Sequence, residues 1–247
     1  MRIVFAGPSL PPSARADWPG IDWRPPAAEG DVYRAARQGP AIVGLIDGYF
    51  ESVPAVWHKE ILWAISHGIA VFGSSSIGAL RAAELARFGM VGVGAVYRYL
   101  LNPLRDDSDV ALVHAPRELD YAGLSEAHVN VHFTLVRAVA DGIVAPSWAH
   151  LLRNISHGIF YKERSWEVIL ARAATSGLPA PVIDRLRNWL QRNRVDQKRQ
   201  DANLLVSTVL GWEGEQRPRP DWTFQHTFQW ELAARRSSEG AFPVTTI

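Results

Sequence analysis

The chain contains no cysteine. This absence excludes disulfide bonds, thiolate metal sites, a cysteine nucleophile and a persulfide carried on this chain. Net charge is also nearly absent, because 26 lysines and arginines stand against 25 aspartates and glutamates. A composition this balanced creates no long-range field of one sign, so we expect neither nucleic acid nor a membrane as a partner.

Long hydrophobic runs are missing as well. The first ten residues, MRIVFAGPSL, carry a short apolar run that is too brief for a signal-peptide core or a membrane span. We therefore expect a cytoplasmic protein. What the chain does have is 247 residues, 47% of them hydrophobic, which is enough to bury a large core without a metal.

Short β-type runs alternate with helical patterns in the N-terminal half. Strands are expected at residues 3–6, 41–46 and 69–73, with a further one at 21–23, and helices at 30–37, 53–67 and 76–88. For the second helix, Ser52 is the expected cap and Pro54 lies in the first turn. This alternation predicts an α/β fold with a doubly wound parallel sheet that has helices on both faces.

Strand signals stop at about residue 125. Helical segments are expected at 126–140, 147–155, 166–174, 182–191 and 197–210. We therefore divide the chain into an α/β domain at 1–118, a mostly α-helical domain at 119–212 and an irregular tail at 213–247, in which residues 221–234 can form one docked helix.

The sequence GSSSIG at 73–78 leads from a strand into a helix N-terminus, where backbone N–H groups and the helix dipole favour an anion. A hydroxyl here can be a nucleophile, although the hydrolase spelling Gly-x-Ser-x-Gly is absent. The alternative is that Ser75 or Ser76 simply caps the helix. Both interpretations stay open.

Further along this helix, Arg81 and Glu84 fall on the same face as Ile77, Leu80 and Leu85. An i,i+3 ion pair over the core explains them structurally. A guanidinium aimed at a substrate and oriented by Glu84 explains them functionally. The pattern gives the two explanations about equal weight.

Other candidates lie near strand ends and helix starts. Asp47 follows a strand and precedes Gly48, so it is either a site carboxylate or part of an Asx turn. His58 and Lys59 lie early in the next helix, and Lys59 can act as a base or an anion clamp, although it is more simply a solvated side chain.

Histidines and charges in the second half have simpler explanations. His128 and His132 have metal-ligand spacing, but without the H-E-x-x-H pattern they are more simply packed or exposed histidines. Asp196 is expected to cap the helix that begins at residue 197, and Lys198 is expected to pair with Asp201. We expect no metal and no cofactor.

Several strings together resemble the TfuA-like family. They are IDGYF at 46–50, HKEILWAI at 58–65, GSSSIGALRAAEL at 73–85 and FGMVGVG at 88–94, with weaker similarity in GPS at 7–9, DDSDVALVH at 106–114 and DQKRQDA at 196–202. Ser74 and Ile77 stand where alanine and methionine are expected in the family, and both are small departures.

The resemblance implies a sulfur-delivery partner of a YcaO-type enzyme, which activates a peptide amide with ATP so that sulfur replaces its oxygen. The implied reaction is hydrolysis of a thiocarboxylated ThiS-like sulfur carrier, which releases sulfide for thioamide synthesis in ribosomal peptides.

For this reaction the residues themselves indicate a mechanism: we expect Ser76, or with less support Ser75, to attack the thioacid carbonyl, with Lys59 or His58 as base and helix N–H groups as oxyanion donors. Arg81 with Glu84 positions the carrier's terminal carboxyl group, and Asp47 orients a base or a water. Water activated by Asp47 or Glu84 fits the same residues. A non-catalytic adaptor that docks and stimulates the YcaO enzyme is the rival reading, and an unrelated hydrolase ranks last.

Overall fold

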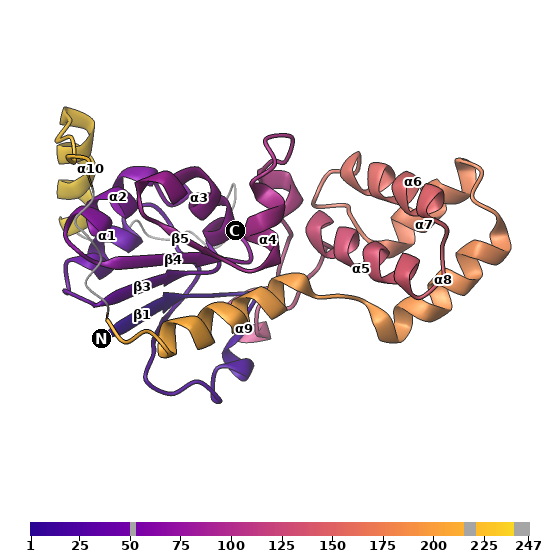
Figure 1. Cartoon of the computed structure of the whole chain (residues 1–247), viewed down its shortest axis with the longest axis horizontal. Coiled ribbons are helices and arrows are strands. Elements are labelled where there is room, and N and C mark those ends of the chain that lie inside the picture. The colour runs from indigo at the N-terminus through magenta and orange to yellow at the C-terminus, as the bar shows by residue number, and fades with distance from the viewer. Residues whose placement is uncertain (50–52, 215–220, 240–247) are drawn as a thin grey trace.

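The computed structural model describes residues 1–49, 53–214 and 221–239. Within them, five parallel strands form one sheet in the order β2-β1-β3-β4-β5 (Figure 1). The strands are β1 (Arg2–Phe5), β2 (Asp22–Arg24), β3 (Ile42–Leu45), β4 (Ala70–Ser74) and β5 (Val91–Val93). The predicted α/β class and parallel sheet are confirmed, and β5 is a strand that the sequence analysis did not find.

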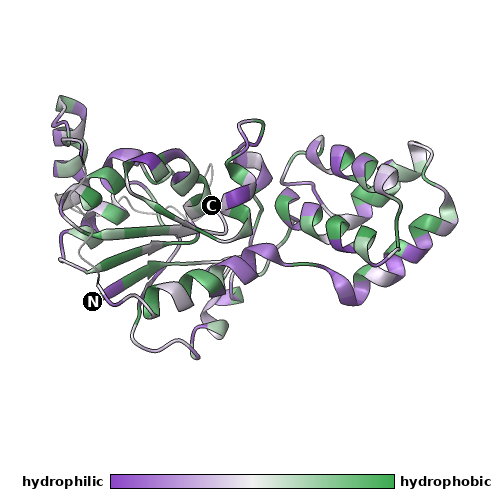
Figure 2. Ribbon diagram, viewed as in Figure 1, coloured by the Kyte–Doolittle hydropathy of each residue, from purple (hydrophilic) through white to green (hydrophobic). Residues whose placement is uncertain are grey.

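The central strands β3 and β4 carry only one polar side chain, that of Ser74, because helices cover both faces of the sheet. Every residue of β3 and β4 is buried, and Figure 2 shows these strands as mainly hydrophobic. One face packs against α1 (Asp31–Ala36), α2 (His58–Ser66) and α3 (Ile77–Leu85). The other face packs against α9 (Gln197–Leu210), whose Leu205 and Val206 are fully buried.

The helix α3 approaches the sheet through its small residues. Gly78, Ala79 and Ala82 are buried, whereas Arg81 is partly exposed and Glu84 is exposed. A Cβ atom on Gly78 would lie 1.7 Å from the carbonyl oxygen of Leu45, so the close contact with β3 requires glycine. Ile77 and Leu85, which share a face with Arg81 and Glu84, are buried as well, and the Arg81 side chain is only 12% exposed, whereas that of Glu84 is 38% exposed.

The helix α2 begins at His58, five residues later than the sequence predicted, and residues 53–57 are not helical. The buried Glu60 carboxylate accepts hydrogen bonds from the backbone N–H groups of Trp57 (2.8 Å), Gly30 (3.1 Å) and Tyr33 (3.1 Å). Glu60 therefore fixes where the helix starts and ties it to the start of α1. The proposed cap Ser52 lies outside the described residues.

A second group of helices lies beside the sheet, at the right of Figure 1, and has its own apolar core. It consists of α5 (His128–Ala140), α6 (Pro146–His157), α7 (Trp166–Thr175) and α8 (Ala180–Asn193). The boundary at 118/119 stays a prediction. α9 follows this group in sequence and returns to the sheet, where α4 (Ala95–Leu100) also packs.

The described part of the tail contains α10 (Phe228–Glu239), which packs against α1. Trp230 anchors it in an aromatic cluster with Tyr33, Trp57, Trp63 and Phe224. The expected docked helix in the tail is thus present, displaced towards the C-terminus. None of the helices in the described ranges combines the length and apolar character that a membrane crossing requires.

Candidate functional site

The strand order places the switch point of the sheet between β1 and β3, and open α/β sheets bind ligands outside the carboxyl ends of the strands at this point. Asp47 follows β3 there and is 1% exposed. Its Oδ2 accepts hydrogen bonds from the N–H groups of Gly7 (2.9 Å) and Ser9 (3.0 Å), and its Oδ1 accepts one from Ser9 Oγ (2.7 Å). Asp47 therefore joins the chain after β3 to the loop after β1.

Next to this loop, β4 turns sharply into α3 through Ser74, Ser75 and Ser76. Ser75 has φ 68°, a left-handed conformation that costs energy for a residue with a Cβ. Its hydroxyl is fully buried and donates to the carbonyl of Lys198 (2.8 Å). Ser75 thus locks the turn against the start of α9.

Ser76 is the more accessible of the two candidate serines and occupies the N-cap position of α3, but its side chain makes no capping hydrogen bond. The expectation that a serine hydroxyl caps α3 is therefore wrong for Ser75 and Ser76 alike. Among the described residues, neither Ser76 Oγ nor the N–H of Ile77 has a hydrogen-bond partner. A free hydroxyl and a free N–H thus lie side by side at a helix N-terminus.

Lys198 is a titratable group that sequence reasoning did not place here. It is 3% exposed, and its Nζ donates to the carbonyl of Val110 (2.7 Å), a residue that packs with Ala79 of α3. Burial lowers the pKa of Lys198, and the negative charge of Asp47 opposes that shift. The predicted Lys198–Asp201 pair does not form, because Asp201 instead accepts from Val96 N–H (2.6 Å).

Further polar groups surround Asp47. Arg15 donates from Nε to Leu10 O (2.9 Å) and from Nη2 to Ala6 O (2.8 Å), and burial lowers its pKa while Tyr121 and Asp47 oppose that shift. Burial and the neighbouring Tyr121 raise the pKa of Tyr49. A cation and two phenols therefore adjoin the switch point and can hold a carboxylate-like group.

A second predicted cluster lies on the outer side of α3. Glu84 Oε2 is 2.8 Å from His58 Nε2 and 2.7 Å from Arg81 Nη1, while Arg81 Nε donates to Val56 O (2.9 Å). Burial would raise the pKa of Glu84, but the hydrogen bonds from His58 and Arg81 hold it below its ordinary value. The expected Arg81–Glu84 ion pair is confirmed, and it secures residues 53–57 beside α3.

Lys59 is not part of either group. Its Nζ donates to the carbonyl of Gln225 and lies 4.7 Å from the centre of the Phe224 ring. It therefore contacts the segment that leads into α10. Of the predicted site residues, the structure brings Ser75, Ser76 and Asp47 to the carboxyl edge of the sheet and groups His58, Arg81 and Glu84, whereas Lys59 stands apart.

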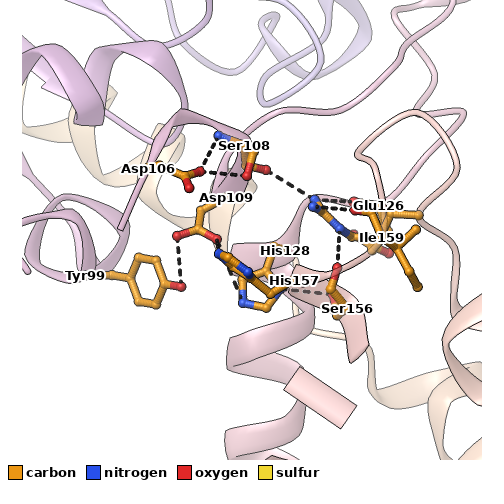
Figure 3. A network of polar contacts seen from close by, with 10 residues as sticks. Tyr99, Asp106, Ser108, Asp109, Glu126, His128, Ser156, His157 and Ile159 are labelled. Carbon is orange, nitrogen blue, oxygen red and sulfur yellow. Dashed lines mark hydrogen bonds and ion pairs between the residues drawn. The ribbon is translucent and has the colours of Figure 1, made fainter. Parts of the chain in front are cut away.

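A buried polar network joins α5 and α6 of the helical group to α4 and the segment that follows it (Figure 3). Asp109 is fully buried, with Oδ1 3.9 Å from His128 Nε2 and 3.8 Å from His157 Nε2. His128 Nδ1 lies 3.0 Å from Ser156 Oγ, but Ser156 is fully buried within α6, so this Asp–His–Ser series offers no substrate a hydroxyl. In the described part of the chain, no group of three or more acidic or histidine side chains can hold a metal.

Comparison with known families matches the middle part of the chain. Residues 47–165 match the model of a family described as TfuA-like protein. This part of the chain is TfuA-like. The TfuA-like region contains Asp47, the serine turn and the Asp109 network, whereas Lys198 lies beyond it. No curated protein matches the chain.

Two residues of the site, Lys198 and Ser9, were not predicted as site residues although the sequence around each is distinctive. Lys198 lies in DQKRQDA at 196–202, and Ser9 lies in GPS at 7–9, two strings that the sequence analysis singled out although both lie outside the matched residues 47–165. Asp196 does cap α9 as expected, since its Oδ1 accepts from Arg199 N–H (3.0 Å). No local pattern showed that α9 would place Lys198 against the serine turn.

Proposed function

We propose that this chain supplies sulfur to a YcaO-type enzyme by hydrolysing the thiocarboxylated C-terminus of a ThiS-like carrier. TfuA-like proteins accompany YcaO enzymes in thioamide formation, and this chain has the TfuA-like region. The observation that carries the proposal is the arrangement at the carboxyl edge of the sheet, where the unpaired Ser76 hydroxyl adjoins a free helix N–H and the backbone carbonyl of the buried Lys198 accepts from Ser75 of the same turn.

Ser76 is the better nucleophile of the two serines. Its hydroxyl is partly accessible, whereas the hydroxyl of Ser75 is buried and donates to a carbonyl. The N–H of the following residue, Ile77, is free to stabilise the oxyanion, as the N–H after the nucleophile does in hydrolases with a strand–turn–helix site. For Ser75 the following N–H, that of Ser76, already donates to Ser74 O (2.8 Å).

The reaction has two steps. Ser76 Oγ forms a bond to the thioacid carbon, its proton passes to the neutral amine of Lys198, and the carbon–sulfur bond breaks to release hydrosulfide. Water then cleaves the ester, and Ser76 Oγ regains a proton. The net reaction consumes one water and yields the carrier carboxylate and hydrogen sulfide.

Other polar side chains position Ser76, Lys198 and the carrier terminus. Burial favours the neutral amine of Lys198, which a base requires, and Asp47 holds the Gly7–Ser9 loop beside it. Arg15 can attract the negatively charged carrier terminus. Arg81 has a structural role, because its guanidinium donates hydrogen bonds to the Val56 carbonyl and to the Glu84 carboxylate.

The covalent intermediate provides the test. The chain is mixed with thiocarboxylated carrier, quenched in acid and weighed by intact-mass spectrometry. We expect an ester-linked adduct in the unmodified chain and in the control Ser207→Ala, whose hydroxyl lies on the exposed side of α9, but none in Ser76→Ala. If the adduct persists in Ser76→Ala and disappears in Ser75→Ala, the nucleophile is Ser75 instead of Ser76. Sulfide release without any adduct would favour direct attack by water.

A further inference from the structure

A separate pocket of about 480 Å³ lies between the segment after α4 and the helices α5 and α6. It is outside the switch point, and the proposed sulfur chemistry uses none of its side chains. Histidine and arginine dominate its lining, which consists of Leu104, Arg105, His128, His132, His150, Arg153, Asn154 and His157.

Two guanidinium groups in this pocket have unused donors. In the part of the chain that the structure describes, the Arg153 side chain makes no hydrogen bond and no ion pair. Arg105 packs over the Tyr99 ring, 4.3 Å from its centre, and its buried Nε has no hydrogen-bond partner. Buried donors without partners are rare because each one costs free energy, so they indicate a missing acceptor.

The imidazoles add further donors. His132 Nδ1 is buried without a hydrogen-bond partner, and the ring lies between Tyr99 and Phe133. His150 and His157 are exposed on α6, where His150 Nδ1 is 3.3 Å from Asn154 Nδ2. Neutral imidazole still offers one N–H, so these rings can donate to an anion without being protonated.

A buried carboxylate beside the pocket does not occupy these donors. Asp109 lies between Tyr99 and the rings of His128 and His157, as Figure 3 shows, and Tyr99 donates to its Oδ2 (3.3 Å). Its Oδ1 has no hydrogen-bond partner among the described residues, and Arg105, Arg153 and His132 line the cavity without donating to Asp109. A cation would meet two guanidinium groups here, and no set of metal ligands exists among the described residues.

We propose that this pocket binds the phosphoryl group of a phosphorylated small molecule. A phosphoryl group presents several acceptor oxygens, which match the forked donors of two arginines together with imidazole N–H groups. The cavity falls within the range of about 300–1,000 Å³ that is typical of small-molecule sites, so it has room for more than the phosphoryl group. Diphosphate is the simplest probe of that chemistry.

The test is calorimetric titration of the full chain with sodium diphosphate, and separately with phosphate, at constant ionic strength in chloride. We expect saturable one-site binding of diphosphate, weakened about tenfold or more by Arg153→Gln, since a charge-assisted hydrogen bond contributes on this scale. The matched control is Arg187→Gln on α8, which removes an exposed arginine paired with Asp184 and should leave binding unchanged.

Three results would overturn the proposal: no saturable binding, equal weakening by Arg187→Gln, or equally tight binding of acetate, which would indicate a general anion site. Arg153 is partly exposed and carries no described side-chain contact, so its variant should fold, and circular dichroism checks this. The titration needs no sulfur carrier, so its outcome is independent of the proposed hydrolysis.

Discussion

Replacing Asp47 should separate its structural role from its charge. The Asp47→Ala variant removes one acceptor group from three buried donors, namely the N–H groups of Gly7 and Ser9 and the Ser9 hydroxyl. Each buried donor left without a partner costs about 1–3 kcal/mol, so for three donors the free energy of unfolding should fall by about 3–9 kcal/mol. This is a large fraction of the stability of an ordinary domain.

The Asp47→Asn variant keeps most of these bonds. The amide oxygen can accept from the two N–H groups, and the amide N–H can donate to Ser9 Oγ, which then acts as acceptor. We expect a loss of only about 1 kcal/mol, since no donor is orphaned. The removed negative charge should also lower the pKa of Lys198 further, because Asp47 opposes the effect of burial there.

Urea unfolding followed by tryptophan fluorescence measures both variants, and the chain has 10 tryptophans to report it. Asp184→Ala is the control, because that exposed carboxylate accepts only from Arg187 and should change stability by less than about 1 kcal/mol. Equal losses for Asp47→Ala and Asp47→Asn would refute the hydrogen-bond account, as would a loss below 1 kcal/mol for the alanine variant.

Three further predictions follow from the packing and the charges. Gly78→Ala should lower stability by about 3 kcal/mol or more in urea unfolding, because its Cβ meets the Leu45 carbonyl at 1.7 Å and neither backbone can yield freely; an unchanged midpoint would contradict this packing. Burial lowers the pKa of His128 to about 3, so the unfolded chain binds the extra proton first and stability should fall by about 2–3 kcal/mol from pH 6.5 to about pH 4.5; His128→Gln should flatten that slope, and an identical slope would disprove it. Trp230→Ala should release α10 (Phe228–Glu239), seen as faster amide hydrogen exchange confined to that helix, whereas protection as in the parent chain would show that other contacts hold it.

Local patterns were sufficient for most of the sheet. Apolar runs ending in glycine predicted β1, β3 and β4 within a residue or so, and the cap at Asp196 predicted α9. β5 was missed because Val91–Val93 is short and contains a glycine, which weakens a strand signal. The start of α2 was misplaced because Glu60 takes its donors partly from α1, an interaction that no local window contains.

The candidate site was predictable only in part. Asp47 and the serine turn were found because each follows a strand, and the carboxyl ends of parallel strands meet at one edge. Lys198 was misread as a partner of Asp201, since its contact with Ser75 spans 123 positions in the sequence. Lys59 was expected near the serines, but the helix turns it towards Gln225 in a segment without periodicity.

The measurement that tests the central claim most directly is sulfide release from a thiocarboxylated ThiS-like carrier by this chain alone, with no YcaO enzyme present. The account predicts catalytic release that falls at least about a hundredfold in both Ser76→Ala and Lys198→Met, while Ser207→Ala keeps the parent rate. No release by the intact chain, together with faster thioamide formation when a YcaO enzyme is added, would contradict hydrolysis and establish the adaptor role instead.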